Sequence, residues 1–191
     1  MGAGLPDLTT DGCSIGEHKA LDPSKYFIIV PNMFGNGLSS SPSHTPALCA
    51  GPRFPNVTAY DNVRQQYRLV TGKFGIATIK LVTGWSMGGL QTYHWGVLYP
   101  DMVERILLFQ GSAKCSRHNF VFLEGAKAAL MADAAFEGGW YEKPPAVHAF
   151  GRVYAGWGFS QTFYRVKAVV ENMGFASLAR GLPRRFLGGC C

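Results

Sequence analysis

The pentapeptide Gly-Trp-Ser-Met-Gly at residues 84–88 constrains the fold of this chain more than any other part of its sequence. An apolar run with β-branched residues, 79–83, precedes it, and a helical pattern of apolar residues, 90–98, follows it. A serine between a buried strand and a helix occupies a strained turn, and glycines two residues away on either side let the two backbones approach closely. The sequence therefore predicts a strand-to-helix corner, termed the nucleophile elbow, that presents the hydroxyl group of Ser86 to solvent.

The elbow is expected to act through its backbone as well as through Ser86. Gly84, Trp85 and Gly88 form the corner, and the following helix directs the positive end of its dipole at the serine. The N–H group of Met87 then points to where an oxyanion would form, and one such donor contributes about 3 kcal/mol in the transition state. G-x-S-x-G also arises by chance in a chain with 24 glycines, so the assignment depends on the flanking strand and helix.

Four further segments extend the alternating pattern. Residues 26–30 form an apolar run bounded by prolines, which predicts a strand buried on both faces, and residues 105–109 predict another strand. Residues 31–58 are rich in proline and glycine and predict a long loop, while residues 60–70 carry apolar residues at helical spacing. Strands that alternate with helices through short connections favour an α/β fold, with a parallel sheet and right-handed crossover helices.

The composition changes after residue 115. Residues 118–136 contain a helix-rich run and residues 154–164 are rich in aromatic residues, which predicts the start of a helical cap. An aromatic cap would shield an acyl site from water, although packing in a core explains the same residues equally well. The predicted organisation is an N-terminal segment, a core with the elbow, the cap region and a basic tail, at residues 1–20, 21–115, 116–178 and 179–191.

Charge, cysteine spacing and hydropathy argue against nucleic-acid and membrane partners and indicate a compartment. The net charge is +6, but five basic residues and one acidic residue lie from Arg165 onward, so the remainder is near neutral and lacks the interleaved basic and aromatic residues of a nucleic-acid site. The five cysteines have no CxxC spacing, which favours reduced thiols in a cytoplasmic protein. No apolar run approaches the roughly 18 residues that cross a bilayer, so no membrane partner is expected.

A serine nucleophile needs an acid and a base, which in such sites follow the serine along the chain as Asp or Glu and then His. His94 lies two helical turns past Ser86 and is interpreted as a packing or surface residue. His118 is expected at a helix start as a capping or docking residue, His148 in an exposed proline-rich link, and Asp133 on a solvated helix face. These residues predict neither a complete triad nor a metal cluster.

Residues from about 21 to 175 resemble the α/β-hydrolase proteins of the homoserine O-acetyltransferase-like group. The segments that carry the resemblance are residues 20–23, 26–41, 54–58, 84–89, 99–105, 111–114 and 152–161. The resemblance implies a ping-pong acyl transferase without a bound cofactor, in which Ser86 takes an acetyl group from acetyl-CoA. A small-molecule alcohol such as homoserine, or water, would accept the acetyl group. The resemblance also leaves a homodimer open.

Two departures from the group affect this expectation. Homoserine enzymes usually carry a second glycine where this chain has Trp85, which leaves a simple esterase open. Family members have further strands before residue 21, and residues 179–191 are unlike the family, so the chain is expected to be truncated at both ends, with a frameshifted tail and the catalytic Asp and His encoded beyond it. A missing acid and base predict little or no activity. The alternatives are a non-catalytic binding protein and a gene product that does not fold stably.

Overall fold

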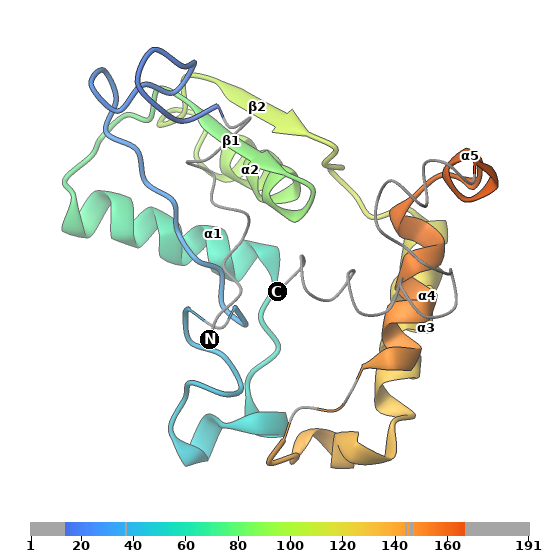
Figure 1. Cartoon of the computed structure of the whole chain (residues 1–191). Helices are drawn as coiled ribbons and strands as arrows, with labels where there is room; N and C mark the ends of the chain where they lie inside the picture. The colour runs from blue at the N-terminus through green and yellow to red at the C-terminus, as the bar shows by residue number, and fades with distance from the viewer. Residues whose placement is uncertain (1–13, 37, 144, 146, 167–191) are drawn as a thin grey trace. The chain divides into compact units, whose positions relative to one another are not determined.

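The computed structural model describes residues 14–36, 38–143, 145 and 147–166 (Figure 1). The chain divides into two compact units, one formed by residues 31–120 and the other by the residues on either side of them. Most of the predicted N-terminal segment, the end of the predicted cap and the whole predicted tail lie outside the described residues. The elbow belongs to the unit formed by residues 31–120, so this unit carries the candidate site.

Helix α1 (Ala59–Arg68) begins at a capping box and confirms the amphipathic helix predicted after the long loop. The hydroxyl group of Thr58 accepts a hydrogen bond from the N–H group of Asp61 (3.2 Å), and the carboxylate of Asp61 accepts one from the N–H group of Thr58 (3.0 Å). These bonds satisfy backbone donors that a helix start leaves free. A π-helical turn, η3 (Leu69–Lys73), continues the helix.

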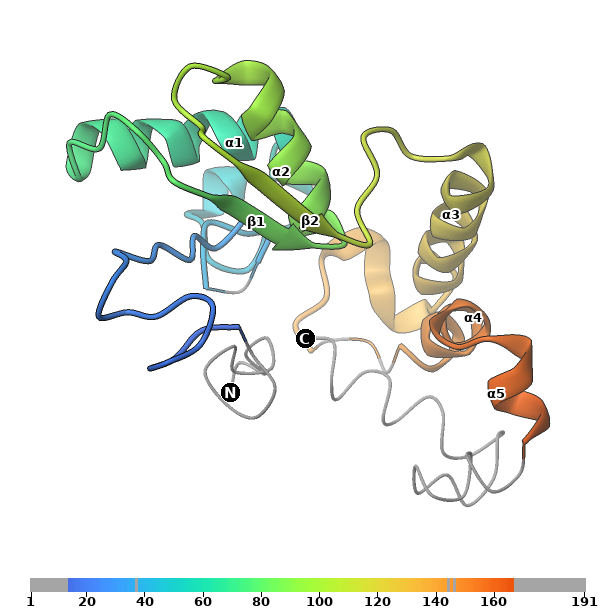
Figure 2. The ribbon, with the colours of Figure 1, turned by 90° about the horizontal axis from the view of Figure 1, so that it is seen from above.

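Two parallel strands and the helix between them form the centre of this unit (Figure 2). Strand β1 (Val82–Trp85) pairs with strand β2 (Ile106–Phe109), and helix α2 (Met87–Leu98) makes the connection between them. An isolated bridge between Ile79 and Val103 extends the pairing toward the strand starts. The predicted parallel sheet with a crossover helix is therefore confirmed, although β1 starts later than the sequence predicts.

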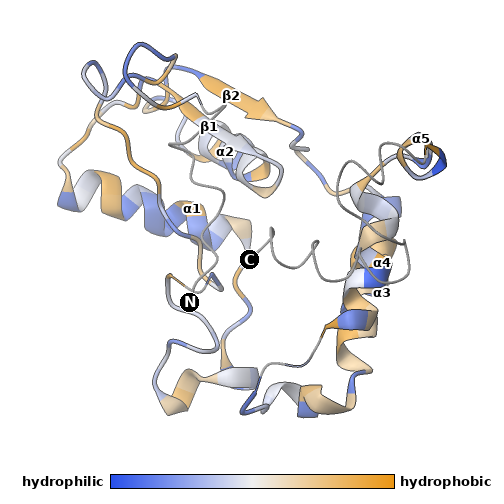
Figure 3. Ribbon diagram, in the orientation of Figure 1, coloured by the Kyte–Doolittle hydropathy of each residue, from blue (hydrophilic) through white to orange (hydrophobic). Residues whose placement is uncertain are grey.

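Helix α2 covers one face of the strand pair, and the other face is apolar and exposed. Gly96 of α2 lies against Ile106, whose side chain would be 3.4 Å from a Cβ atom at residue 96. Because side chains alternate along a strand, Trp85, Leu107 and Phe109 point to the opposite face, where they are 62, 48 and 44% exposed. Figure 3 shows the apolar character of β2. Parallel sheets are normally covered on both faces, so this face contributes least to stability.

A polar network joins α1 to α2. The indole N–H group of Trp95 donates a hydrogen bond to the side-chain carbonyl of Gln66 (2.9 Å), and the amide group of Gln66 donates one to the side-chain carbonyl of Gln91 (2.8 Å). The amide group of Gln91 in turn contacts the sulfur atom of Met33. Trp95 and Gln91 are buried. Because buried polar groups are costly unless paired, this network holds the two helices and the start of the loop in one arrangement.

Two predictions about the first part of the chain have different outcomes. The loop at residues 31–58 is confirmed, since its described residues form only two short 3₁₀ turns, η1 (Ala47–Cys49) and η2 (Gly51–Arg53). The buried strand predicted at residues 26–30 is wrong, because Phe27 is 72% exposed and the segment joins no sheet. A strand persists only beside a hydrogen-bonded neighbour, and in the described part of the chain β1 and β2 pair with each other alone.

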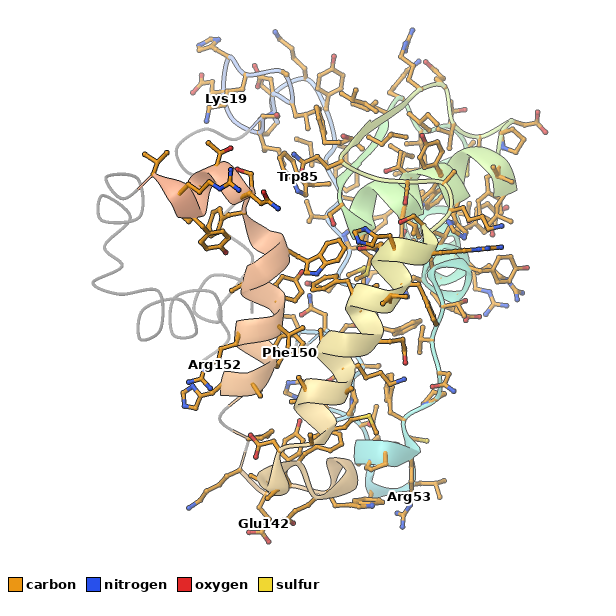
Figure 4. All side chains as sticks on the ribbon, turned by 90° about the vertical axis from the view of Figure 1, so that its right-hand side faces the viewer. Lys19, Arg53, Trp85, Glu142, Phe150 and Arg152 are labelled. Atoms are coloured by element: carbon orange, nitrogen blue, oxygen red, sulfur yellow. The ribbon has the colours of Figure 1, made fainter. Side chains whose placement is uncertain are left out.

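The helical segments after the sheet pack through aromatic rings. They are α3 (Arg117–Met131), the 3₁₀ segment η4 (Ala134–Gly139), α4 (His148–Gly158) and α5 (Gln161–Arg165). Helices α3 and α4 lie side by side (Figure 4), and the ring of Phe122 stacks on that of Trp157 with the centroids 4.4 Å apart. Phe122 also contacts the ring of Tyr154 at 5.3 Å. The predicted helical character is confirmed, while a role of these helices as a cap stays a prediction.

The capping box at α1 can be tested by removing its hydroxyl group. We expect Thr58→Ala to lower the free energy of unfolding by about 1 kcal/mol, because the first helical turn loses its side-chain acceptor. Urea denaturation followed by circular dichroism measures this loss. Ser40→Ala, at an exposed loop residue, is the control. An equal loss in both variants would contradict the capping role of Thr58.

Asp22 is a buried carboxylate whose contribution to stability depends on pH. It is 2% exposed and accepts hydrogen bonds from the hydroxyl group (2.7 Å) and N–H group (2.9 Å) of Ser24 and from the N–H group of His18 (3.1 Å). These bonds hold the pKa of Asp22 below its ordinary value of 3.8. A lowered pKa stabilises the fold above the ordinary value, and the stabilisation is lost as the pH falls through the lowered pKa.

We therefore expect Asp22→Asn to unfold at a lower urea concentration than the wild type at neutral pH. The difference should shrink as the pH falls below 3.8, because the wild-type carboxyl group then becomes neutral as well. Urea titrations at neutral and acidic pH measure both differences, with Asp101→Asn at an exposed carboxylate as the control. A difference that does not change with pH would show that the charge of Asp22 contributes nothing.

Candidate active site

Ser86 lies between β1 and α2 in a backbone conformation that residues other than glycine rarely adopt. Its φ angle is 52° and its ψ angle is −111°. Such a conformation costs about 1–3 kcal/mol and persists only where the surrounding structure imposes it. The N–H group of Ser86 donates a hydrogen bond to the carbonyl of Phe109 (2.9 Å), and the carbonyl of Ser86 accepts one from Leu90 (3.0 Å). Ser86 is exposed, so the strained turn presents it to solvent as the elbow pattern predicts.

The glycine requirement of the elbow falls on Gly84. A Cβ atom at residue 84 would lie 2.3 Å from the carbonyl carbon of Gly88, so no side chain fits there. A Cβ atom at Gly88 would meet no atom within 4 Å, and residue 88 could carry a side chain. The expectation that both glycines are needed for close packing is therefore correct only for Gly84. Residue 84 must lack a side chain, because the backbone of Gly88 lies where that side chain would be.

A second close approach, which the elbow pattern does not predict, joins α2 to the segment after β2. A Cβ atom at Gly89 would lie 2.9 Å from the Cα atom of Gly111, and one at Gly111 would lie 2.7 Å from the Cα atom of Gly89. Each position thus excludes a side chain because of the other. The glycine at residue 89 directly after the pentapeptide was the available signal, but its partner is 22 residues away in sequence.

Met87, the predicted oxyanion donor, is the first residue of α2. The first N–H groups of an α-helix have no partner within the helix, and the positive end of the helix dipole lies beside Ser86. This arrangement can stabilise negative charge next to the serine hydroxyl group. The side chain of Met87 is exposed, so it does not bury the corner.

Trp85 lies on the face of the sheet opposite α2. Gly84 faces α2, so the next residue along β1 points the other way. The ring of Trp85 stacks against that of its register partner Phe109, with centroids 6.3 Å apart and planes at 25° (Figure 4 labels Trp85). The bulk of the indole is therefore accommodated along the sheet.

The residues considered as acid or base occupy different elements. His94 is half-buried within α2, where its Nδ1 atom lies 3.0 Å from the carbonyl of Leu90. His118 is the second residue of α3 and is exposed, but Ser116 provides the cap of that helix, since its hydroxyl group accepts from the N–H group of Asn119 (3.1 Å). His118 is therefore not the cap of α3, while the alternative expectation of a docking role stays a prediction.

The remaining two candidates lie in the other unit. His148 is exposed, as expected, but it begins α4 instead of lying in a link. Asp133 does not lie within a helix, because α3 ends before it, and its carboxylate caps η4 by accepting from Ala135 (3.0 Å). Among the described residues, no histidine or carboxylate hydrogen-bonds the hydroxyl group of Ser86.

The described residues bear on three further expectations, which concern a metal site, a membrane span and the cysteines. No group of three or more His, Cys, Asp or Glu side chains there could hold a metal ion. No helix of that part is long and apolar enough to cross a membrane. Cys49 and Cys115 are exposed free thiols, and the other three cysteines lie outside the described residues.

The parallel strands, the crossover helix and the strained serine between them define an α/β fold with a sharp strand-to-helix corner at Ser86. A family profile described as "alpha/beta hydrolase fold" matches residues 4–181. The chain belongs to the α/β-hydrolase family.

Individual relatives fall into two groups. An ethyl acetate hydrolase of Pseudomonas veronii is 47% identical over 168 residues, which are 86% of this chain and 48% of that protein. A homoserine O-acetyltransferase of Chlorobium chlorochromatii is 39% identical over 136 residues, which are 68% of this chain and 38% of that protein. The resemblance to the homoserine O-acetyltransferase-like group is confirmed by such relatives.

A solved structure agrees with both the fold and the first of these groups. The structure of the acetyl esterase MekB superposes with a TM-score of 0.79 at 41% identity, over 92% of this chain and 55% of that one. The chain spans between 38 and 55% of the length of these three relatives.

The unequal roles of the two elbow glycines give a direct prediction. We expect Gly84→Ala to destabilise the chain by about 3 kcal/mol or to prevent folding, because the new methyl group overlaps the backbone of Gly88. Gly88→Ala should fold with at least wild-type stability, because alanine favours the helix and meets no atom. Thermal unfolding followed by circular dichroism compares the two. Similar losses in both variants would contradict the observed elbow geometry.

Proposed function

We propose that the protein is a serine esterase that hydrolyses acetate esters of short alcohols, with Ser86 as its nucleophile. The observation that carries the proposal is the φ angle of 52° at Ser86, a strained and exposed serine at the junction of a parallel strand and a helix. The likeness to an ethyl acetate hydrolase and to an acetyl esterase supports the choice of substrate. These two proteins are also more similar in sequence to the chain than the homoserine O-acetyltransferase is.

In the proposed reaction, the Oγ atom of Ser86 attacks the carbonyl carbon of the ester. The carbonyl oxygen becomes an oxyanion that accepts a hydrogen bond from the N–H group of Met87 at the positive end of α2. The tetrahedral intermediate then collapses to an acetyl ester of Ser86, and the departing alkoxide takes up the proton that the serine hydroxyl group lost and leaves as the alcohol. Attack by water on that ester releases acetate and restores the serine.

The proton of the serine hydroxyl group must pass to a base. In the described part of the chain no histidine or carboxylate is bonded to Ser86, so we expect slow acylation of this chain. Removal of a serine's base leaves only the catalysis due to binding and the oxyanion donors.

Acetyl transfer to an alcohol is a second candidate. The likeness to a homoserine O-acetyltransferase favours it, because the same acetyl-serine would form from acetyl-CoA and an alcohol would replace water in the second half. The two candidates share Ser86 and Met87 and differ only in the acyl donor and in the molecule that takes the acetyl group.

The nucleophile can be tested with a fluorophosphonate probe, which forms a covalent bond with reactive serines. We expect slow labelling of the wild-type chain, mapped by mass spectrometry to Ser86 and abolished in Ser86→Ala. Ser112→Ala, at another exposed serine after a strand, is the matched control and should be labelled as the wild type is. Labelling that persists in Ser86→Ala would contradict the proposal.

A second measurement separates the esterase from the transferase. It compares the acetate formed from ethyl acetate with the O-acetylhomoserine formed from acetyl-CoA and homoserine.

A further inference from the structure

Gln110, the residue directly after β2, has a φ angle of 49°, in the same left-handed range as Ser86 directly after β1. Trp85 and Phe109 are register partners, so Ser86 and Gln110 are the next residues along two adjacent parallel strands. Neighbouring strands lie about 4.8 Å apart. Figure 2 shows that β1 and β2 end side by side. Two strained residues that are not glycine therefore adjoin at the carboxyl edge of this sheet.

The contacts around Gln110 hold it in this conformation. On one side, the carbonyl of Phe109 accepts a hydrogen bond from the N–H group of Ser86 (2.9 Å). On the other side, Gly111 lies so close to Gly89 that a Cβ atom at residue 111 would be 2.7 Å from it. Both neighbours of Gln110 are thus fixed to the elbow, and the position of Gln110 follows that of Ser86.

Glycine would adopt the φ angle of Gln110 without strain, and glycine already occupies the adjoining close-packed positions. A glutamine that keeps this conformation costs stability, and such costs concentrate at binding and catalytic sites. Gln110 is exposed, and none of the hydrogen bonds among the described residues involves its carboxamide. Ligands of open parallel sheets bind outside the carboxyl ends of the strands, and Gln110 lies at the carboxyl end of β2.

We infer that Gln110 is a substrate-binding residue whose carboxamide donates a hydrogen bond to an oxygen atom of the ester held at Ser86. The inference rests on the proposed function for the identity of the ligand. The carboxamide of Gln110 would add a side-chain donor to the proposed backbone donor of Met87. The ligand must then carry an acceptor oxygen atom, either on a carbonyl group or on a tetrahedral centre.

The test measures stability and binding separately, in a Ser86→Ala background that cannot be acylated. The probe is ethyl methylphosphonate, a stable tetrahedral mimic of the ester after attack, and its dissociation constant is measured by NMR titration. We expect Gln110→Gly to raise the melting temperature, because strain is relieved, and to weaken phosphonate binding by about fivefold, as the loss of one hydrogen bond predicts. Gln110→Met, which keeps the size of the side chain, should weaken binding equally without the gain in stability.

Glu137→Gly is the matched control, because Glu137 has a φ angle of 48° in the other unit. It should raise the melting temperature and leave phosphonate binding unchanged. The inference is overturned if the Gln110 variants bind the phosphonate as tightly as the background chain, or if the background chain does not bind it. Fluorophosphonate labelling of the wild type reports on Ser86 independently of this test. If Ser86 is not labelled, phosphonate binding can still depend on Gln110, and if binding does not depend on Gln110, Ser86 can still be labelled.

Discussion

The rest of the site depends on the near contact between Gly84 at the end of β1 and the backbone of Gly88 in the first turn of α2. No side chain fits at residue 84, because its Cβ atom would lie 2.3 Å from the carbonyl carbon of Gly88. This approach is what lets the chain turn from strand to helix within the single residue Ser86. The turn imposes the positive φ angle of Ser86 and makes Met87, the next residue, the first residue of α2.

The second strand completes the corner from the other side. Phe109 accepts the hydrogen bond of the Ser86 N–H group, and Gly111 lies against Gly89 in α2. The ends of β1 and β2 and the start of α2 therefore pack backbone against backbone, and a side chain at Gly84, Gly89 or Gly111 would overlap backbone atoms there. The polar network of Trp95, Gln66 and Gln91 supports the same helix further along by fixing it to α1.

The sequence predicts local features of this unit well and distant ones poorly. The two strands, helix α2 and the elbow follow from patterns within about 30 residues, because hydrophobic periodicity and glycine spacing report local geometry directly. Residues 26–30 have an equally strong strand pattern but form no strand, because pairing needs a neighbour that composition does not reveal. The contact of Gly89 with Gly111, and the strain at Gln110, likewise arise only when β2 is placed beside β1.

The most direct test of this account is the conformation of Ser86 in an electron-density map of the chain at a resolution that defines backbone carbonyls. We expect a φ angle near 52° at Ser86, with its N–H group bonded to the carbonyl of Phe109 and its side chain open to solvent. A negative φ angle at Ser86, or a hydroxyl group buried beneath α2, would contradict it.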